Sequence, residues 1–208
     1  MDQNVLDSLK KWPNVPNCFG WLGLDRRGDW RMRNEFAQAH QLPGDVIKHV
    51  ALKEFIERNY ARDHEGRFFF QNGPQRVFVS IDYTPWIVRL IPDEKNQWHL
   101  KTTTGQSIEP MTALLDENGQ VLFEAEFEVI CVTDESSSAF KKTSIRSVAL
   151  LHDHDLAIFS ELAEMTQNAC SMSGVMHWHD QEIPIEQILS KDLPQQFAYI
   201  KTPVATHE

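Results

Sequence analysis

The 208-residue chain carries 30 acidic and 20 basic side chains, which gives it a formal net charge of −10. That charge repels nucleic-acid phosphates and anionic membrane surfaces, so neither is expected as a partner. No stretch approaches the roughly 20 apolar residues that cross a bilayer. Residues 1–4 are polar and lack the features of a signal peptide, and three widely spaced cysteines fit reduced thiols. We therefore expect a cytoplasmic protein.

The N-terminal half predicts two helices and several strands. Residues 3–11 are amphipathic and predict a short helix that ends at the prolines within 12–16. Helical spacing of apolar residues predicts a second helix over 49–60. Apolar residues alternate in 76–82, 86–90 and 97–104, which predicts strands separated by turns.

An Asp-x-x-Gly tetrapeptide occurs three times, at residues 25–28, 63–66 and 116–119. Asp at the first position accepts hydrogen bonds from the backbone that follows it, and Gly at the fourth tolerates positive φ, as in a type I turn with a bulge. We interpret the first and third as hairpin turns. The second follows the predicted helix, and we interpret it as a link from that helix to a strand.

The C-terminal half contains the clearest strand pattern, over 121–132, in which apolar residues alternate with glutamates. A polar loop over 134–142 and a strand over 144–151 are expected to follow it. Residues 154–168 predict a longer helix capped by Asp153 or Asp155, and 175–179 with 182–185 predict a further hairpin.

These elements predict an α+β fold, with hairpin-rich, mostly antiparallel sheets and two or three packed helices. We expect two small lobes. The N-terminal α+β lobe spans 1–105, and the C-terminal lobe, β-rich with one long helix, spans 106–208.

One group of polar and aromatic residues suggests a ligand-binding site on two turns. Amide, guanidinium and aromatic side chains can orient a ligand by hydrogen bonding and stacking. The alternative is structural, because Asn-Gly-Pro favours a turn and a tryptophan on a strand is often core. The candidate ligand-binding residues are Gln71, Asn72, Gln75, Arg76, Tyr83 and Trp86.

Two His-x-His-Asp motifs suggest a metal site. Residues i and i+2 of a strand point the same way, so His152 with His154, and His177 with His179, could each present two imidazoles to a zinc ion. The two pairs together would supply a metal-dependent hydrolase, with Asp153 or Asp180 as base. The alternative is that the first pair caps a helix and the second is solvated on an edge hairpin.

A third candidate is acidic. Glu124, Glu126 and Glu128 share one face of the predicted strand and could dock a basic protein partner or a cation. They could equally form a solvated face, or pair with basic side chains of a neighbouring strand. The sequence contains no nucleophile elbow, phosphate-binding loop or dinucleotide fingerprint.

Several segments resemble a family of uncharacterised proteobacterial proteins. The resemblance covers most of the chain, up to Leu193, Pro194 and Phe197. A fainter similarity between residues 30 and 104 points to a second uncharacterised bacterial family with two small α+β and β-roll lobes. Neither family implies a catalytic residue. The segments that carry the first resemblance are KWPNVP at 11–16, GWLGLD at 20–25, GDWRMR at 28–33, FFQNGPQRV at 69–77 and YTPW at 83–86.

We therefore expect a bacterial, cytoplasmic protein that binds a small molecule or a peptide, or regulates through such binding, without catalysis or a cofactor. The alternatives are the zinc-dependent hydrolase and the acidic protein–protein interaction module. The sequence leaves the oligomeric state open and is compatible with a homodimer.

Overall fold

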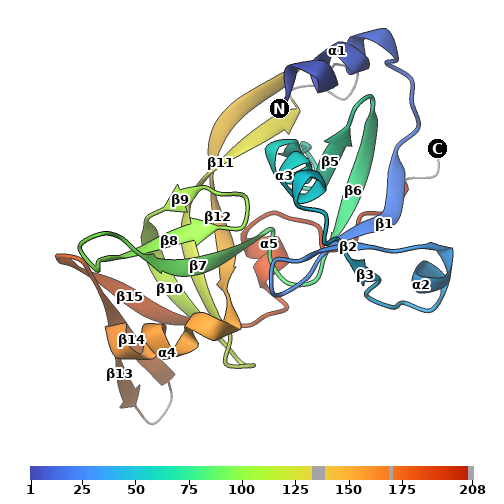
Figure 1. Ribbon diagram of the computed structural model, residues 1–208. Helices are drawn as coiled ribbons and strands as arrows, with labels where there is room; N and C mark the ends of the chain where they lie inside the picture. Colours follow the sequence, from blue (N-terminus) through green and yellow to red (C-terminus); the bar gives the residue numbers. More distant parts are fainter. Residues whose placement is uncertain (133–138, 169–170, 206–208) are drawn as a thin grey trace. The chain divides into compact units, whose positions relative to one another are not determined.

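The computed structural model describes residues 1–132, 139–168 and 171–205. In this part of the chain, five α-helices and a single 3-10 turn accompany fifteen strands, which confirms the α+β class (Figure 1). The strands form a mixed sheet, in which parallel and antiparallel pairs both occur. None of the helices in the described residues has the length and apolar character needed to cross a membrane.

The chain groups into two compact units, each assembled from separate segments. Unit 1 comprises Met1–Pro85, Glu128–Ser144 and Ala198–Glu208. Unit 2 comprises Trp86–Phe127 and Ile145–Phe197. The lobes expected over 1–105 and 106–208 stay a prediction.

The sheet of unit 1 has the strand order β3-β2-β1-β6-β5-β4. Strand β1 is paired on both sides, antiparallel to β2 and parallel to β6, and β4 pairs with the end of β11. The strands are β1 (Cys18–Leu24), β2 (Trp30–Met32), β3 (Asp45–Val46), β4 (Tyr60–Arg62), β5 (Phe68–Asn72) and β6 (Gln75–Ile81).

Three helices belong to unit 1. The predicted helices over 3–11 and 49–60 are confirmed as α1 (Gln3–Lys11) and α3 (Val50–Arg58). A short helix not expected from the sequence, α2 (Glu35–Ala39), begins where the side chain of Asn34 accepts a hydrogen bond from the backbone of Ala37. Figure 1 shows α3 beside β5, and their contact agrees with that view.

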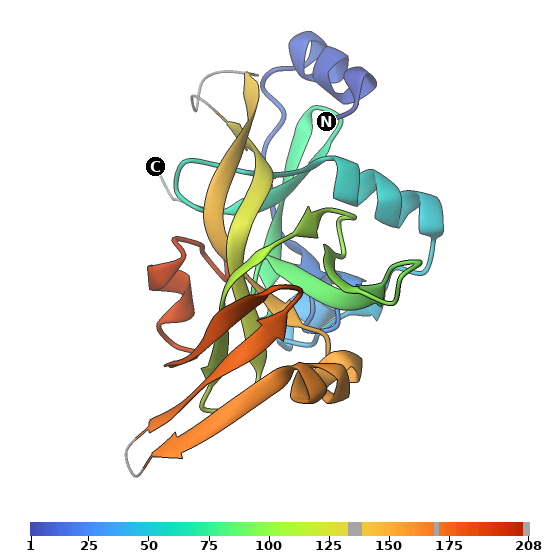
Figure 2. The same ribbon diagram turned by 90° about the vertical axis from the view of Figure 1, so that its left-hand side faces the viewer.

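Unit 2 is built around two long strands, β11 (Val121–Val132) and β12 (Phe140–Leu151), which pair with each other and continue into unit 1 (Figure 2). Moving outward from β11, the next strands are β10, β15, β14 and β13. Moving outward from β12, they are β7, β8 and β9. The remaining elements are β7 (Trp86–Pro92), β8 (Trp98–Thr102), β9 (Ser107–Ile108), β10 (Pro110–Asp116), α4 (Leu156–Leu162), β13 (Ala163–Asn168), β14 (Ser171–Trp178), β15 (Gln181–Ile188) and α5 (Leu193–Gln196).

The strand predicted over 121–132 is confirmed, but burial alternates only over 125–129, because Leu122 and Glu124 on the opposite face are buried as well. Phe123, Ala125 and Phe127 are fully buried, and Phe127 stacks on Trp86 with ring centroids 4.3 Å apart. Strand β12 already begins at Phe140, so the loop expected over 134–142 is wrong at its end, whereas 133–138 lie outside the described residues.

The helix predicted over 154–168 is wrong in its second half. Helix α4 ends at Leu162, and the next six residues form β13, which pairs antiparallel with β14. The expected cap also differs, because the carboxylate of Asp155 accepts hydrogen bonds from Arg89 and from the backbone of Leu90. Instead, His152 Nδ1 accepts the N–H of His154 and caps the 3-10 turn. Strand pairing has overridden helical spacing at Ala163 and beyond.

One turn template recurs in the described residues. The side chain of the first turn residue accepts a hydrogen bond from the backbone N–H of the residue four positions later. The backbone N–H of the fourth turn residue donates to the carbonyl of the first. The fourth residue has positive φ. In the three Asp-x-x-Gly turns, Asp Oδ1 accepts two backbone N–H groups at 2.8–3.1 Å. All three close antiparallel hairpins, so interpreting 63–66 as a helix-to-strand link was wrong. The same template recurs at 93–96, with Asn in place of Gly, and at 102–105, with Thr in place of Asp.

Candidate functional site

The predicted ligand-binding amides serve the fold. Gln71 is fully buried, and its Nε2 donates to the carbonyl of Gly73 at 2.9 Å, inside the β5–β6 hairpin. Gln75 Nε2 donates to the carbonyl of Pro16 at 3.1 Å. Both amides thus hold backbone segments in place. Asn72, in the same hairpin, is exposed.

The predicted aromatic residues belong to the cores of their units. Tyr83 is 4% exposed, and its carbonyl accepts a hydrogen bond from Tyr199 Oη at 2.6 Å. Trp86 is 2% exposed, and its ring packs against Phe127. The structural alternative therefore accounts for Trp86, whereas Tyr83, although buried, has Lys201 5.5 Å from its ring centroid.

Arg76 lies elsewhere. Its guanidinium stands over the ring of Phe69, 5.3 Å from the centroid. It also lines a cavity of about 240 Å³ together with Arg67 and Asn17. Neither this cavity nor the larger pocket described below brings the six predicted residues together.

The histidines of the first predicted pair lie close together. A ligand atom of each, with one from Asp153, lies within 4.8 Å of the others, and neither His177 nor His179 joins this group. The lone pair of His152 Nδ1 already accepts the N–H of His154 at 3.1 Å. Burial lowers the pKa of His152, and the positive charge of Arg89 lowers it further. The arrangement fits a neutral capping histidine.

The second pair does not present two imidazoles to one point. Strand β14 ends at Trp178, and His179 follows in a turn with φ of +52°. His177 Nε2 lies 3.1 Å from Glu164, whereas His179 Nε2 lies 2.8 Å from the carbonyl of Trp98. The two rings therefore engage different neighbours.

The glutamates of β11 differ in their surroundings. Glu124 is buried and paired with Arg146. Glu128 pairs with Lys142 of the neighbouring strand β12. Pairing across strands, one of the two structural alternatives, accounts for both carboxylates.

The two described cysteines have poorly activated thiols. Burial raises the pKa of Cys18, and burial also raises that of Cys131 although Arg62 opposes it. A raised pKa keeps a thiol protonated and therefore weakly nucleophilic. Cys170 lies outside the described residues.

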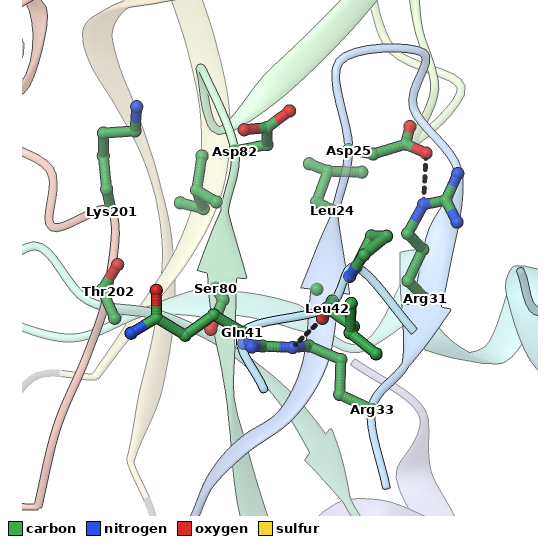
Figure 3. A pocket seen from close by; sticks show the side chains of 13 residues that line it. Leu24, Asp25, Arg31, Arg33, Gln41, Leu42, Ser80, Asp82, Lys201 and Thr202 are labelled. Atoms are coloured by element: carbon green, nitrogen blue, oxygen red, sulfur yellow. Dashed lines mark hydrogen bonds and ion pairs between the residues drawn. The ribbon is translucent and has the colours of Figure 1, made fainter. Parts of the chain in front are cut away.

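A larger pocket, of about 420 Å³, lies on the sheet of unit 1 (Figure 3). That volume suits a small organic molecule. Its floor crosses three strands, because Gly23 of β1 faces Arg31 across the β1–β2 pair and Ser80 across the β1–β6 pair. The pocket is lined by Gly23, Leu24, Asp25, Arg31, Arg33, Gln41, Leu42, Pro43, Ser80, Ile81, Asp82, Lys201 and Thr202.

Two charge pairs at the pocket are internally neutralised. Arg31 Nε donates to Asp25 Oδ2 at 2.6 Å, and the other carboxylate oxygen accepts two backbone N–H groups of its turn. Asp82 pairs with Arg26 at 3.2 Å, and both side chains are about half exposed. Figure 3 shows Arg31 extending toward Asp25.

Two other cations at the pocket have no carboxylate partner among the residues that the structure describes. Arg33 and Lys201 form no ion pair with any residue of the described chain at 4.0 Å or less. Arg33 donates through Nε to the carbonyl of Leu42 at 3.1 Å. The ammonium of Lys201 stands 5.5 Å from the ring centroid of Tyr83. Ser80, Gln41 and Thr202 add neutral hydrogen-bonding groups.

The loop over 41–44 is held by Arg31 of β2 and by Arg33, which directly follows that strand. Arg33 donates to Leu42, and Arg31 Nη1 donates to the carbonyl of Gly44 at 3.1 Å. Gly44 has φ of +80°, and a Cβ there would lie 2.3 Å from the carbonyl oxygen of Met32. The loop is therefore fixed by polar contacts and by close backbone packing.

The C-terminal segment brings Lys201 and Thr202 to the pocket. The carbonyl of Lys201 accepts the N–H of Ile81 at 2.7 Å, and Ile200 N donates to the carbonyl of Gly66 at 3.0 Å. Arg62 donates to the carbonyl of Ala198 at 2.6 Å. Backbone hydrogen bonds thus tie residues 198–201 to the sheet.

Sequence reasoning missed this pocket, although one signal was present. Arg31 and Arg33 are two residues apart next to a glycine-containing strand, so period-2 geometry places both guanidiniums on one face. Nothing near Lys201 in the sequence connects it with them. Its place in the site follows from tertiary structure.

The comparison with protein families gives one match. The family model DUF2944, whose description reads protein of unknown function (DUF2946), matches residues 1–204. The chain belongs to this family. No curated protein and no solved structure matches the chain, so no similar protein points to an activity.

Proposed function

We propose that this family member is a binding protein without catalytic activity, and that the pocket on unit 1 holds a small molecule with an anionic group. The observation that carries the proposal is the pair of cations, Arg33 and Lys201, which line one pocket without a carboxylate partner among the described residues.

An oxyanion offers these cations a charged acceptor, which no described residue supplies within 4.0 Å. Hydrogen bonds to charged groups each contribute about 1.5–3 kcal/mol, and the planar guanidinium of Arg33 matches a carboxylate or a phosphate in a bidentate fashion. Ser80 and Thr202 can bind further oxygens. The neighbouring carboxylates are already paired, Asp25 with Arg31 and Asp82 with Arg26. They therefore do not neutralise Arg33 or Lys201.

The low activation of the two described thiols and the capping role of His152 support a binding function over a catalytic one. The two described cysteines are free, and free thiols support placing the protein in the cytoplasm. A peptide ligand is the alternative to a small molecule, its terminal carboxylate occupying the same cations.

The test is a thermal-shift and calorimetric screen of carboxylates and phosphates at constant ionic strength. We expect one class of anion to stabilise the wild-type protein, as linkage requires of any ligand of the native state. Lys201→Gln and Arg33→Gln should each weaken that binding roughly 10- to 100-fold, the equivalent of about 1.5–3 kcal/mol.

Two variants serve as controls. Lys10→Gln removes an exposed charge of α1 outside the pocket and should bind as the wild type does. Arg33→Lys keeps the positive charge but loses the planar, bidentate guanidinium, so its affinity for the anion should lie between those of wild type and Arg33→Gln. If no carboxylate or phosphate raises the melting temperature more than sodium chloride does, the proposal is wrong.

A further inference from the structure

The glycine at the centre of the pocket floor is not required by the backbone. Gly23 lies inside β1, which is hydrogen-bonded on both sides. Glycine weakens a strand interior and in such a place often marks a close approach of a ligand. A Cβ at Gly23 would meet only Ser80 O at 3.5 Å and Arg33 Cδ at 3.9 Å, both ordinary contacts, and no positive φ is involved.

Two other glycines of unit 1 provide the contrast. Gly20, in the same strand, has φ of +79°, and a Cβ there would lie 2.6 Å from Gln38 Oε1. Gly44 has φ of +80° and a similar clash with Met32. Conformation and packing explain those two glycines, whereas neither explains Gly23. What Gly23 leaves open is the pocket itself.

The surroundings of Gly23 indicate what fits there. The floor is bare backbone at Gly23, which lies between the side-chain-bearing residues Arg31 and Ser80 of the neighbouring strands. Leu42 and Pro43 give the pocket an apolar wall, and Leu42 is 43% exposed. An inorganic anion would use the cations but neither the bare floor nor this wall.

We propose that the ligand is a planar organic carboxylate, such as an aromatic acid. Its ring lies on the backbone at Gly23 beside Leu42 and Pro43, and its carboxylate faces Arg33, whose Cδ would lie 3.9 Å from a Cβ at Gly23. This inference rests on the proposed function. Gly23 is then the residue that sets the size of the ligand, because any side chain there would occupy the space of the ring.

The test compares wild type with Gly23→Ala and Gly23→Val by titration calorimetry at constant ionic strength. The probes are sodium benzoate, sodium 2-naphthoate, sodium acetate and inorganic phosphate. We expect the wild type to bind at least one aromatic acid at least 10-fold more tightly than acetate or phosphate. Gly23→Val should weaken the aromatic acid at least 10-fold and change phosphate binding less than twofold. Gly23→Ala should fall between wild type and Gly23→Val.

The outcomes separate the two proposals. Unchanged affinity of Gly23→Val for the aromatic acids overturns the inference, and so does a wild type that binds acetate or phosphate as tightly as benzoate and naphthoate. In both cases the anion-binding proposal stands. A wild type that binds none of the probes overturns the inference, and the wider screen of carboxylates and phosphates then decides the anion-binding proposal. Thermal melts check that the variants fold, and if Gly23→Val does not fold, a loss of less than threefold in Gly23→Ala overturns the inference.

Discussion

Replacing Asp155 by alanine should destabilise the protein by about 2–4 kcal/mol. Asp155 is 3% exposed and accepts three hydrogen bonds, two from Arg89 at 2.6 and 2.9 Å and one from the N–H of Leu90 at 3.0 Å. The alanine leaves the buried N–H of Leu90 without an acceptor, which costs about 1–3 kcal/mol. The Arg89 side chain is 44% exposed and can be rehydrated, so loss of the ion pair adds only about 1 kcal/mol.

Asparagine at the same position separates the two contributions. Its amide oxygen can still accept the Leu90 N–H, so Asp155→Asn should cost about 1–2 kcal/mol. The measurements are urea unfolding at pH 7 and hydrogen exchange of the Leu90 amide, which should accelerate in the alanine variant far more than in the asparagine variant. Glu161→Ala, at an exposed position of α4, is the control and should change the stability by less than about 0.5 kcal/mol.

The pH dependence checks the same reasoning. Burial raises the pKa of Asp155, but the hydrogen bonds from Arg89 and Leu90 and the charge of Arg89 lower it overall. A carboxyl with a lowered pKa in the native state stabilises the fold above its unfolded pKa, about 4, and this stabilisation is lost as the pH falls through the folded pKa. The difference between wild type and Asp155→Asn should therefore shrink below pH 4. A difference below 0.5 kcal/mol between wild type and Asp155→Ala at pH 7 would refute the account.

Three further predictions concern other parts of the molecule. Gly66→Ala should destabilise the protein more than Gly119→Ala in thermal melts. Both glycines end Asp-x-x-Gly turns with positive φ, but a Cβ at Gly66 would lie 2.4 Å from Ala198 O, whereas a Cβ at Gly119 would have no atom within 4 Å. Equal decreases in melting temperature for the two variants would contradict this reasoning. Burial lowers the pKa of His152, so the free energy of unfolding should fall as the pH drops below about 6.5. The fall should be shallower in His152→Asn, and equal pH dependence in the two proteins would contradict a neutral His152 in the native state. Because His152 Nδ1 caps its turn, EDTA should leave the melting temperature unchanged, whereas a drop accompanied by released zinc would restore the metal hypothesis.

Local patterns predicted the local structure well. The period-2 pattern over 121–132 predicted the strand itself, and it reports the two sides of β11 over 125–129, where one face is buried and the other exposed. The Asp-x-x-Gly turns are self-contained, since the aspartate satisfies backbone groups within five residues. The turn at 93–96 has the same geometry but not the Asp-x-x-Gly sequence, because Asn96 adopts the positive φ that glycine adopts in the other turns.

Predictions that depend on tertiary pairing were less successful. Residues 163–168 carry helical spacing, yet the antiparallel partner strand β14 decides their conformation. The candidate ligand-binding residues were predicted from residue type near turns. In the structure, Gln71 donates a hydrogen bond to the carbonyl of Gly73, and the carbonyl of Tyr83 accepts one from Tyr199. The pocket joins Arg33 with Lys201 from the other end of the chain, and no local pattern encodes such a distant pairing.

The discontinuous composition of unit 1 has a consequence for dissecting the protein. The chain leaves and re-enters this unit, so no single cut releases it whole. A truncation ending at residue 105 would keep Arg33 and Gly23 but lose Lys201, and β4 would lose its partner Ile130. Deleting residues 201–208 alone would remove Lys201, which has no carboxylate partner among the described residues, and would leave the N–H of Ile81 without its acceptor. Binding studies on this protein therefore need the full-length chain, and a tag belongs at its N-terminus.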